Sequence, residues 1–247
     1  MIDTIKAEFR KLLSVRSTYF NLAISLAIVA LFAGYGTGFR GSAQDLQASG
    51  VLAEQATSAV IFVGLILAFV GLLLAGNEYR YNTIMYTLTT ANRRWKVLAA
   101  KFVVISIFAI VASLVMAFCS PLFTAIGAHI AGKDIGPQVF DIWSIVLRCA
   151  FCGWGYAMYA FILLLLIRNQ VGAIVTFLMV PLIGESIIMQ LFKHIGPYLP
   201  FTGLQSVAQP LGLGNDTTSA HGVAVVSVYV AIGLFVSLVL FVRRDAN

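Results

Sequence analysis

The sequence predicts an all-α membrane protein with six transmembrane helices, and two observations lead to this prediction. Of the 247 residues, 60% are hydrophobic and only 11% are charged, whereas a soluble domain carries about 25% charged residues. The apolar residues also gather in runs of roughly 17–25 residues, the length of a helix that spans a bilayer. Residues 1–247 are therefore expected to form one transmembrane domain, with no second soluble domain.

Six apolar runs are expected to form the spans. They cover Tyr19–Gly34, Thr57–Gly76, Val97–Ala117, Trp143–Ile167, Val171–Leu191 and Val223–Val242. The first run is short for a complete crossing of the bilayer. An even number of spans places both ends of the chain on the same side of the membrane.

The basic residues indicate which side that is. The side of the N-terminus carries twelve of them: Lys6, Arg10, Lys11, Arg16, Arg80, Arg93, Arg94, Lys96, Lys101, Arg168, Arg243 and Arg244. The other side carries Arg40, Lys133, Arg148 and Lys193. Loops rich in Lys and Arg stay in the cytoplasm, so both termini are expected there. This distribution explains the net charge of +6 better than a nucleic-acid partner does.

Residues 1–18 are predicted to form an amphipathic helix in the membrane interface. The apolar residues Ile2, Ile5, Phe9, Leu12 and Leu13 recur at helical spacing and share one arc. The charged residues Asp3, Lys6, Glu8, Arg10 and Lys11 fall outside that arc. Such a helix lies in the interface with its basic side chains toward the headgroups. The alternative is a solvated basic tail before a signal anchor.

Residues 77–96 form the longest expected cytoplasmic loop. Asn82 suits the N-cap of a short helix. The apolar stripe of that helix consists of Tyr81, Ile84, Met85 and Leu88. Threonines surround the stripe, and Arg93-Arg94 ends the segment. The pattern predicts a short amphipathic helix parallel to the membrane. The alternative is a helix that only rests on the headgroups while its arginines fix the topology.

Residues 192–215 are apolar but too broken by proline and glycine to span the membrane. Irregular backbone persists at membrane depth only where protein shields it or where it lines a cavity. The segment is therefore predicted to form a re-entrant pair of short helices on the outer side, with an exposed surface loop as the alternative.

No catalytic, cofactor-binding or metal site is predicted. The chain has no Gly-x-x-x-x-Gly-Lys-Ser/Thr phosphate loop. His129, His194 and His221 are far apart in sequence and lack the spacing of zinc ligands. Cys149 and Cys152 lie inside the fourth span, where small residues usually serve helix packing. The neighbouring stretch GWGYAMYAF also indicates close helix contact.

Two charges inside the membrane, Arg148 and Glu185, are predicted to pair. At 1.5 Å per residue, Arg148 lies roughly 7–8 Å and Glu185 roughly 9 Å below the outer ends of their antiparallel spans. Ionisable residues within membranes usually face the interior and tend to pair. Separate snorkelling of each side chain to water is the alternative.

The stretch from Gly76 to Lys101 resembles the first cytoplasmic loop of type-2 ATP-binding-cassette (ABC) transporter permeases. That family has a Glu closing span two, an Arg soon after, a Gly-Thr pair, an Arg cluster and a Lys entering span three. The corresponding residues are Glu78, Arg80, Asn82-Thr83, Arg93-Arg94 and Lys101. IKAEFRKLLSVRSTYF is similar to the interfacial helix of the family, with matches at Glu8, Arg10 and Lys11. Asn82 replaces the usual Gly, and Asn also tolerates a left-handed backbone.

The resemblance implies a bacterial inner-membrane permease for export of an amphipathic drug, a peptide antibiotic or bacteriocin, or a lipid-like molecule, in resistance or immunity. It implies two copies of a separate ATPase subunit, which bind ATP and Mg, and a second permease, identical or different. The loop helix would dock on the ATPase through Tyr81, Ile84, Met85 and Leu88, with Thr83 beside them. Glu78, Arg80, Arg93 and Arg94 would hold the loop by pairing. An ion-coupled secondary transporter and a non-transporting scaffold are the alternatives.

Overall fold

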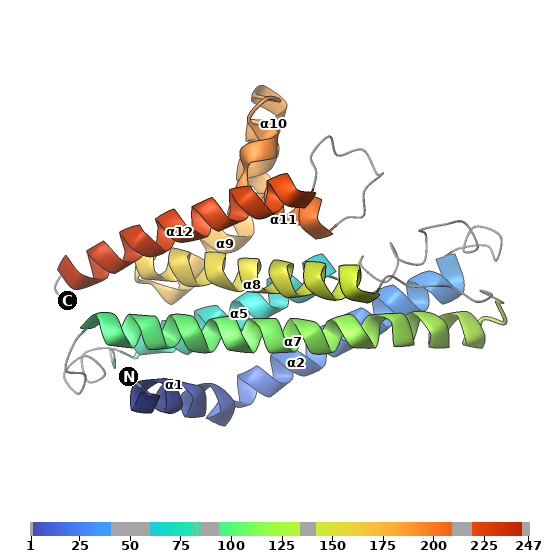
Figure 1. Cartoon of the computed structure of the whole chain (residues 1–247), viewed down its shortest axis with the longest axis horizontal. Helices are drawn as coiled ribbons and strands as arrows, with labels where there is room; N and C mark the ends of the chain where they lie inside the picture. Colours follow the sequence, from blue (N-terminus) through green and yellow to red (C-terminus); the bar gives the residue numbers. More distant parts are fainter. Residues whose placement is uncertain are drawn as a thin grey trace.

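Long apolar helices lying side by side make up the fold (Figure 1). The computed structural model describes residues 2–40, 60–81, 83, 94–133, 142–208 and 219–243. Within these residues every regular element is a helix, which confirms the all-α prediction. In this described part of the chain, six helices are long and apolar enough to cross a membrane.

The elements follow in chain order, and the π-helical and 3-10 segments carry the letter η. They are α1 (Ile2–Ser14), α2 (Arg16–Val29), η1 (Ala30–Arg40), α5 (Val60–Arg80), α7 (Arg94–Ile130), α8 (Ile142–Ile167), α9 (Gln170–Met179), η2 (Val180–Glu185), α10 (Ser186–Leu191), η3 (Gly196–Tyr198), α11 (Pro200–Ala208) and α12 (Ser219–Arg243). The candidate spans are Arg16–Phe39, Phe62–Arg80, Trp95–Ile130, Val146–Ile167, Gln170–Leu191 and Ser219–Phe241.

Each candidate span overlaps its predicted run, but the first and third are longer than predicted. The first continues to Phe39 and the third continues to Ile130. The predicted first run ended at Gly34. In the structure, Gly34 packs closely against α7, because a Cβ at Gly127 of α7 would collide with the carbonyl of Gly34. A Cβ at Gly38 would similarly lie 2.7 Å from the carbonyl oxygen of Gly127. The added parts of both helices therefore pack closely on each other.

Helix α8 lies at the centre of the bundle, between α5 and α7 and against α9, α11 and α12. Its side chains Tyr156, Met158 and Phe161 are fully buried. Neighbouring helices approach it at small residues: a Cβ at Gly64 of α5 would collide with Tyr156, and one at Gly153 would collide with a serine of α7. The prediction that the GWGYAMYAF stretch packs against other helices is confirmed.

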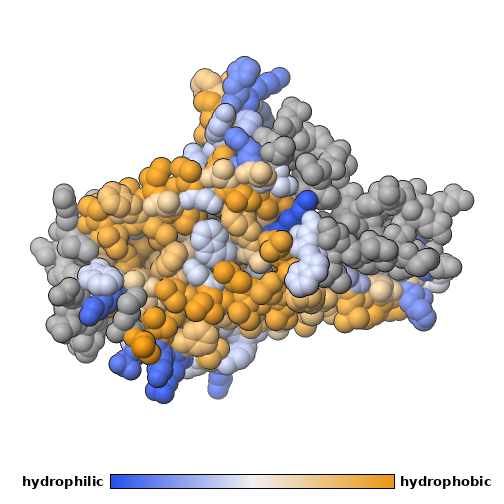
Figure 2. All heavy atoms as spheres, viewed as in Figure 1, coloured by the Kyte–Doolittle hydropathy of each residue, from blue (hydrophilic) through white to orange (hydrophobic). Residues whose placement is uncertain are grey.

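The outward faces of the bundle are apolar. Hydrophobic residues cover most of the face drawn in Figure 2. On α9 and α12, exposed side chains include Val171 (68%) and Phe235 (69%). Such faces suit contact with lipid tails rather than water. Together with the six candidate spans, they support a multi-pass membrane protein.

The chain leaves the bundle after α9 and returns through short helices. Helix α10 projects away from the long helices in Figure 1, and α11 leads back to α12. Two short helices, η3 and α11, lie within the predicted outer segment. Residues 209–215 of that segment lie outside the described residues.

The ends of α5 and α12, the start of α7 and helix α1 share one end of the bundle (Figure 1). These elements carry Lys6, Arg10, Lys11, Arg80, Lys96 and Lys101. We refer to it as the basic end.

Candidate functional site

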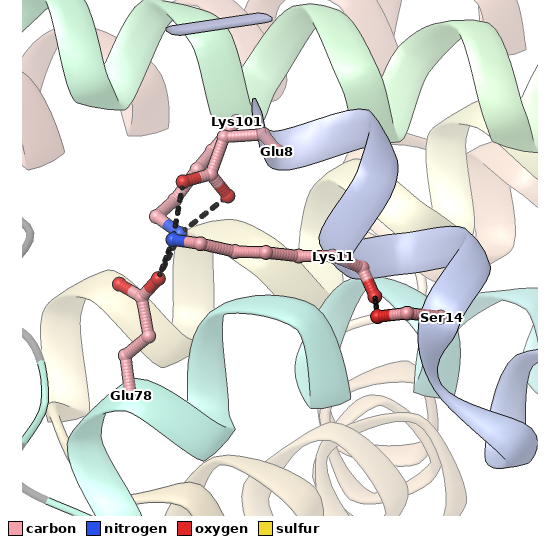
Figure 3. Close-up of polar contacts among 5 residues, drawn as sticks. All are labelled: Glu8, Lys11, Ser14, Glu78 and Lys101. Carbon is pink, nitrogen blue, oxygen red and sulfur yellow. Dashed lines mark hydrogen bonds and ion pairs between the residues drawn. The ribbon is translucent and has the colours of Figure 1, made fainter. Parts of the chain in front are cut away.

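Three helices meet at the basic end through four charged side chains. Glu8 and Lys11 come from α1, Glu78 from the last turn of α5, and Lys101 from the N-terminal part of α7. Figure 3 shows both ammonium groups between the two carboxylates. We call these four residues the ion cluster.

The contacts of the ion cluster form a closed ring in which all four N···O distances are 2.8 Å. Lys11 Nζ donates to Glu8 Oε1 and to Glu78 Oε1. Lys101 Nζ donates to Glu8 Oε2 and again to Glu78 Oε1. Each lysine therefore bridges both carboxylates, and the formal charges of the ring sum to zero.

Three members of the ion cluster are sealed from solvent. Glu8 is 1%, Lys101 4% and Glu78 7% exposed, whereas the side chain of Lys11 is 43% exposed. An isolated buried charge is very costly, so such groups persist only when paired and hydrogen-bonded. Glu78 Oε2 is buried without a hydrogen-bond partner. Among the described residues, the negative charge of Glu78 is therefore compensated only by the two lysines at Oε1.

Lys11 remains charged in this setting. Burial by itself lowers its pKa, but hydrogen bonds to Glu78 and Glu8 and their negative charge outweigh burial. The pKa of Lys11 is therefore raised above the usual 10.5. The positive charge needed by both carboxylates is present throughout the neutral pH range.

Local sequence positions α1 for these contacts. Glu8 and Lys11 are three residues apart and so share one face of the helix. Leu12 packs against Val70 of α5 and Val104 of α7. Ile5 and Phe9 pack beside them. Thr18 Oγ1 donates to the carbonyl of Leu12 at 2.8 Å, which fixes the turn between α1 and α2.

The predicted orientation of α1 needs a correction. The helix itself and the burial of Leu12 agree with the sequence pattern, but Glu8, predicted to face away from the apolar arc, is buried. Ile2 (69% exposed) and Leu13 (42%) of that arc face outward, away from the neighbouring helices. The physical reason is that α1 packs on protein and satisfies the buried Lys101 with Glu8.

Of the residues predicted to hold the loop by pairing, the structure describes the side chains of Glu78 and Arg80. Glu78 pairs with lysines and faces inward, whereas Arg80 is exposed and lies 5.5 Å from the centre of the Tyr81 ring. The backbone N–H of Thr83 donates to the carbonyl of Glu78, so the chain turns directly after α5. Ile84, Met85, Leu88 and Arg93, named in the coupling prediction, lie outside the described residues, and of Arg94 only the backbone is described, as the first residue of α7.

The structure does not bring Arg148 and Glu185 together. Among the described residues, Glu185 instead accepts hydrogen bonds from the backbone N–H groups of Phe201 (2.9 Å) and Thr202 (3.0 Å). The hydroxyl of Thr202 donates to it as well, at 3.0 Å. The first N–H groups of a helix have no partner within the helix, and the Glu185 carboxylate supplies one for α11. The π-helical turn of η2 ends at Glu185 and places it there.

Glu8 was not predicted as a site residue, and Lys101 was predicted as one only through its match to the family pattern. The available signals were the Glu-x-x-Lys spacing in α1 and two opposite charges at the ends of otherwise apolar runs. Elsewhere in the described residues, His, Cys and acidic side chains form no group that could hold a metal ion.

The ion cluster predicts a large loss of stability when its buried lysine is removed. Lys101→Met leaves two buried carboxylates with one lysine and should lower the free energy of unfolding by about 3–5 kcal/mol. Adding Glu8→Gln removes the excess negative charge, so the double variant should recover part of the loss. Thermal unfolding in detergent measures both effects. Lys6→Met, at an exposed position of α1, is the control, and equal stability of Lys6→Met and Lys101→Met would contradict the role of the cluster.

The contacts of Glu185 predict a different result from a charge pair. Glu185→Ala removes the acceptor for the first turn of α11 and should cost roughly 1.5–3 kcal/mol. Glu185→Gln keeps one acceptor oxygen and should cost less. The exchange Arg148→Glu with Glu185→Arg should restore nothing, because an arginine side chain has no acceptor. Folded yield after size-exclusion chromatography tests this, and rescue by the exchange would refute the capping role.

Comparison with known proteins identifies the family of the chain. The model of the ABC-2 family transporter proteins matches residues 4–192, and no curated protein matches the sequence. The match covers most of the chain and includes all four members of the ion cluster. The family forms the membrane component of ABC transporters, whose ATPase is a separate subunit. The chain belongs to the ABC-2 family of transporter proteins and is a multi-pass permease that works with an ABC ATPase subunit.

Proposed function

We propose that this permease is the membrane part of an ATP-driven exporter, and that the ion cluster transmits the motion of its ATPase to three helices at once. The observation that carries the proposal is the ring of four 2.8 Å contacts joining α1, α5 and α7. Residues 82–93 connect α5, which carries Glu78 in its last turn, to α7, which carries Lys101. A force on that connection therefore acts on both helices and, through the cluster, on α1.

The chemistry of the ring supports movement as one unit. Hydrogen bonds between charged groups weaken steeply beyond about 3.5 Å, and separation of the helices would leave buried charges unpaired. Sliding one helix end past another is thus much less favourable than moving all three ends together. The apolar contacts of Leu12 with Val70 and Val104 also oppose sliding of the three helix ends.

In this proposal the basic end faces the cytoplasm of a bacterium, at its inner membrane. The excess of Lys and Arg at this end supports that orientation. The ATPase, in two copies, contacts the helix expected in residues 82–93, and a second permease, identical or different, completes the pathway. ATP and Mg bind in the ATPase subunits.

The proposed substrate is an amphipathic drug, a peptide antibiotic or bacteriocin, or a lipid-like molecule. The resemblance to bacterial export permeases supports this class. The apolar faces of α9 and α12 are also accessible to molecules dissolved in the bilayer. Inverted vesicles that contain the permease and its ATPase should take up such a substrate with ATP. Uptake that persists with an ATPase lacking its catalytic glutamate, and stops with a protonophore, would instead indicate ion coupling.

The coupling contact predicts that Leu88→Asp abolishes co-purification of the ATPase while the permease still inserts. The new charge would enter an apolar protein contact without a partner, which costs several kcal/mol. Thr90→Asp, on the opposite face of the expected helix, is the matched control. Affinity purification of tagged permease, with the ATPase detected by immunoblot, measures the result. Unchanged recovery of the ATPase with Leu88→Asp would show that this apolar stripe does not contact the ATPase.

The proposed orientation predicts the accessibility of introduced cysteines. In a variant whose three native cysteines are replaced by serine, a cysteine at Ser42 or Thr218 should react with an impermeant maleimide in intact cells. A cysteine at Thr89 should react only after lysis. Labelling of the Thr89 position in intact cells would show that the proposed topology is inverted.

A further inference from the structure

A cavity of about 360 Å³ lies beside the ion cluster, in the angle between the α1–α2 turn and α5. We name it the elbow pocket. Its polar lining includes Lys11, Ser14, Ser17 and Asn21, and its apolar lining includes Leu73 and Leu74. We propose that the elbow pocket binds a glycerophospholipid of the leaflet at the basic end, through the phosphate and the first part of an acyl chain.

The order of the lining groups matches the order of groups in a phospholipid. Tyr81, Asn77, Leu74 and Val70 line the pocket along α5. At 1.5 Å per residue, the distance from Tyr81 to Val70 along the helix is roughly 16 Å. Along α5 the polar residues Tyr81 and Asn77 lie at the basic end, and the apolar residues Leu74 and Val70 lie toward the middle of the bundle. A headgroup and its acyl chain follow the same sequence from the membrane surface inward.

Lys11 supplies the group that recognises phosphate. An ammonium carries three N–H donors, and two of those on Lys11 are used by Glu8 and Glu78. Its half-exposed side chain lines the pocket, so one donor remains for an acceptor such as a phosphate oxygen. Glu78 also lines the pocket; the two lysines that contact its Oε1 balance its charge, and its Oε2 is buried.

The surroundings of the pocket favour an anion at the membrane surface. Arg16 and Arg80 are exposed and adjoin the lining residues Val15, Ser17 and Tyr81 in sequence. Exposed basic residues near a bilayer attract phosphate-bearing headgroups. Tyr81 is 65% exposed, and exposed tyrosines gather at the interface between headgroups and hydrocarbon.

The volume of the pocket favours a small amphiphile over a protein segment. Pockets for small molecules measure about 300–1,000 Å³, whereas a helix with its side chains is about 10–12 Å wide. A bound phospholipid would brace the α1–α2 turn against α5, next to the ion cluster. A ligand that binds only the folded state also stabilises it. The proposal does not depend on the direction of transport or on its substrate.

Delipidated protein in detergent provides the test, with native mass spectrometry and thermal unfolding as the measurements. Phosphatidylethanolamine or phosphatidylglycerol should bind at one retained lipid per permease and raise the unfolding temperature. Diacylglycerol with the same chains, and inorganic phosphate alone, should do neither. Equal binding of diacylglycerol would show that the pocket recognises only the apolar chains. Equal stabilisation by inorganic phosphate would show that it recognises only the anion. Either result overturns the proposal.

Two variants locate the bound lipid without touching the ion cluster. Asn21→Trp fills the pocket and should lower phospholipid retention ~tenfold, a change of about 1.4 kcal/mol. Ala23→Trp, at an exposed position of the same helix, is the matched control and should bind normally. Ser17→Glu places a negative charge near the phosphate but favours the first turn of α2, so it should weaken binding more than Ser17→Gln does. Normal retention in Asn21→Trp and Ser17→Glu would exclude the elbow pocket as the lipid site.

Discussion

A charge can be buried in an apolar bundle only if an opposite charge lies within hydrogen-bonding distance, and this requirement joins three helices at the basic end. Lys101 is 4% exposed, and its ammonium group contacts Glu8 and Glu78 at 2.8 Å each. Glu8 belongs to α1, so the N-terminal helix has to dock on α5 and α7 for the buried lysine to be compensated. The position of α1, the turn into α2 and the pocket beside that turn all follow from this compensation.

The choice of lysine suits the geometry of the ring. An ammonium is a compact charge with three donors that point in different directions, whereas the planar guanidinium of arginine matches a single carboxylate with two parallel hydrogen bonds. Lys11 and Lys101 each contact two carboxylates that come from different helices. A lysine can therefore bridge α1 to α5, which an arginine bound to one carboxylate would do less well.

The spans could be predicted from the sequence because crossing a bilayer depends mainly on the length and composition of a segment. The burial of Glu8 could not, because the apolar arc of α1 was interpreted as if the helix faced only lipid. Glu8 turns inward because it pairs with Lys101, which is 93 residues away along the chain. The spacing of apolar residues within α1 does not indicate such a distant partner. The docking of α1 is thus a tertiary effect that overrides a correct local pattern.

The error at Glu185 has a different physical origin. Its predicted depth assumed a straight α-helix with a fixed rise per residue, but the span changes to a π-helical turn over Val180–Glu185. That turn brings the carboxylate to the unpaired N–H groups of α11 instead of to Arg148. No pattern of apolar residues distinguishes a straight span from one that bends at this depth.

The acidic residues at the two ends of the bundle therefore join different partners. Glu78 and Glu8 join helices that are distant in sequence, whereas Glu185 joins η2 to α11. Between them, α8 packs against its neighbours at glycines, where side chains leave little space for rotation. The ring ties α1, α5 and α7 together at the basic end, and α8 is packed between two of them. In the coupling we propose, a displacement that begins at the basic end would therefore reach the far half of the bundle as a tilt of whole helices.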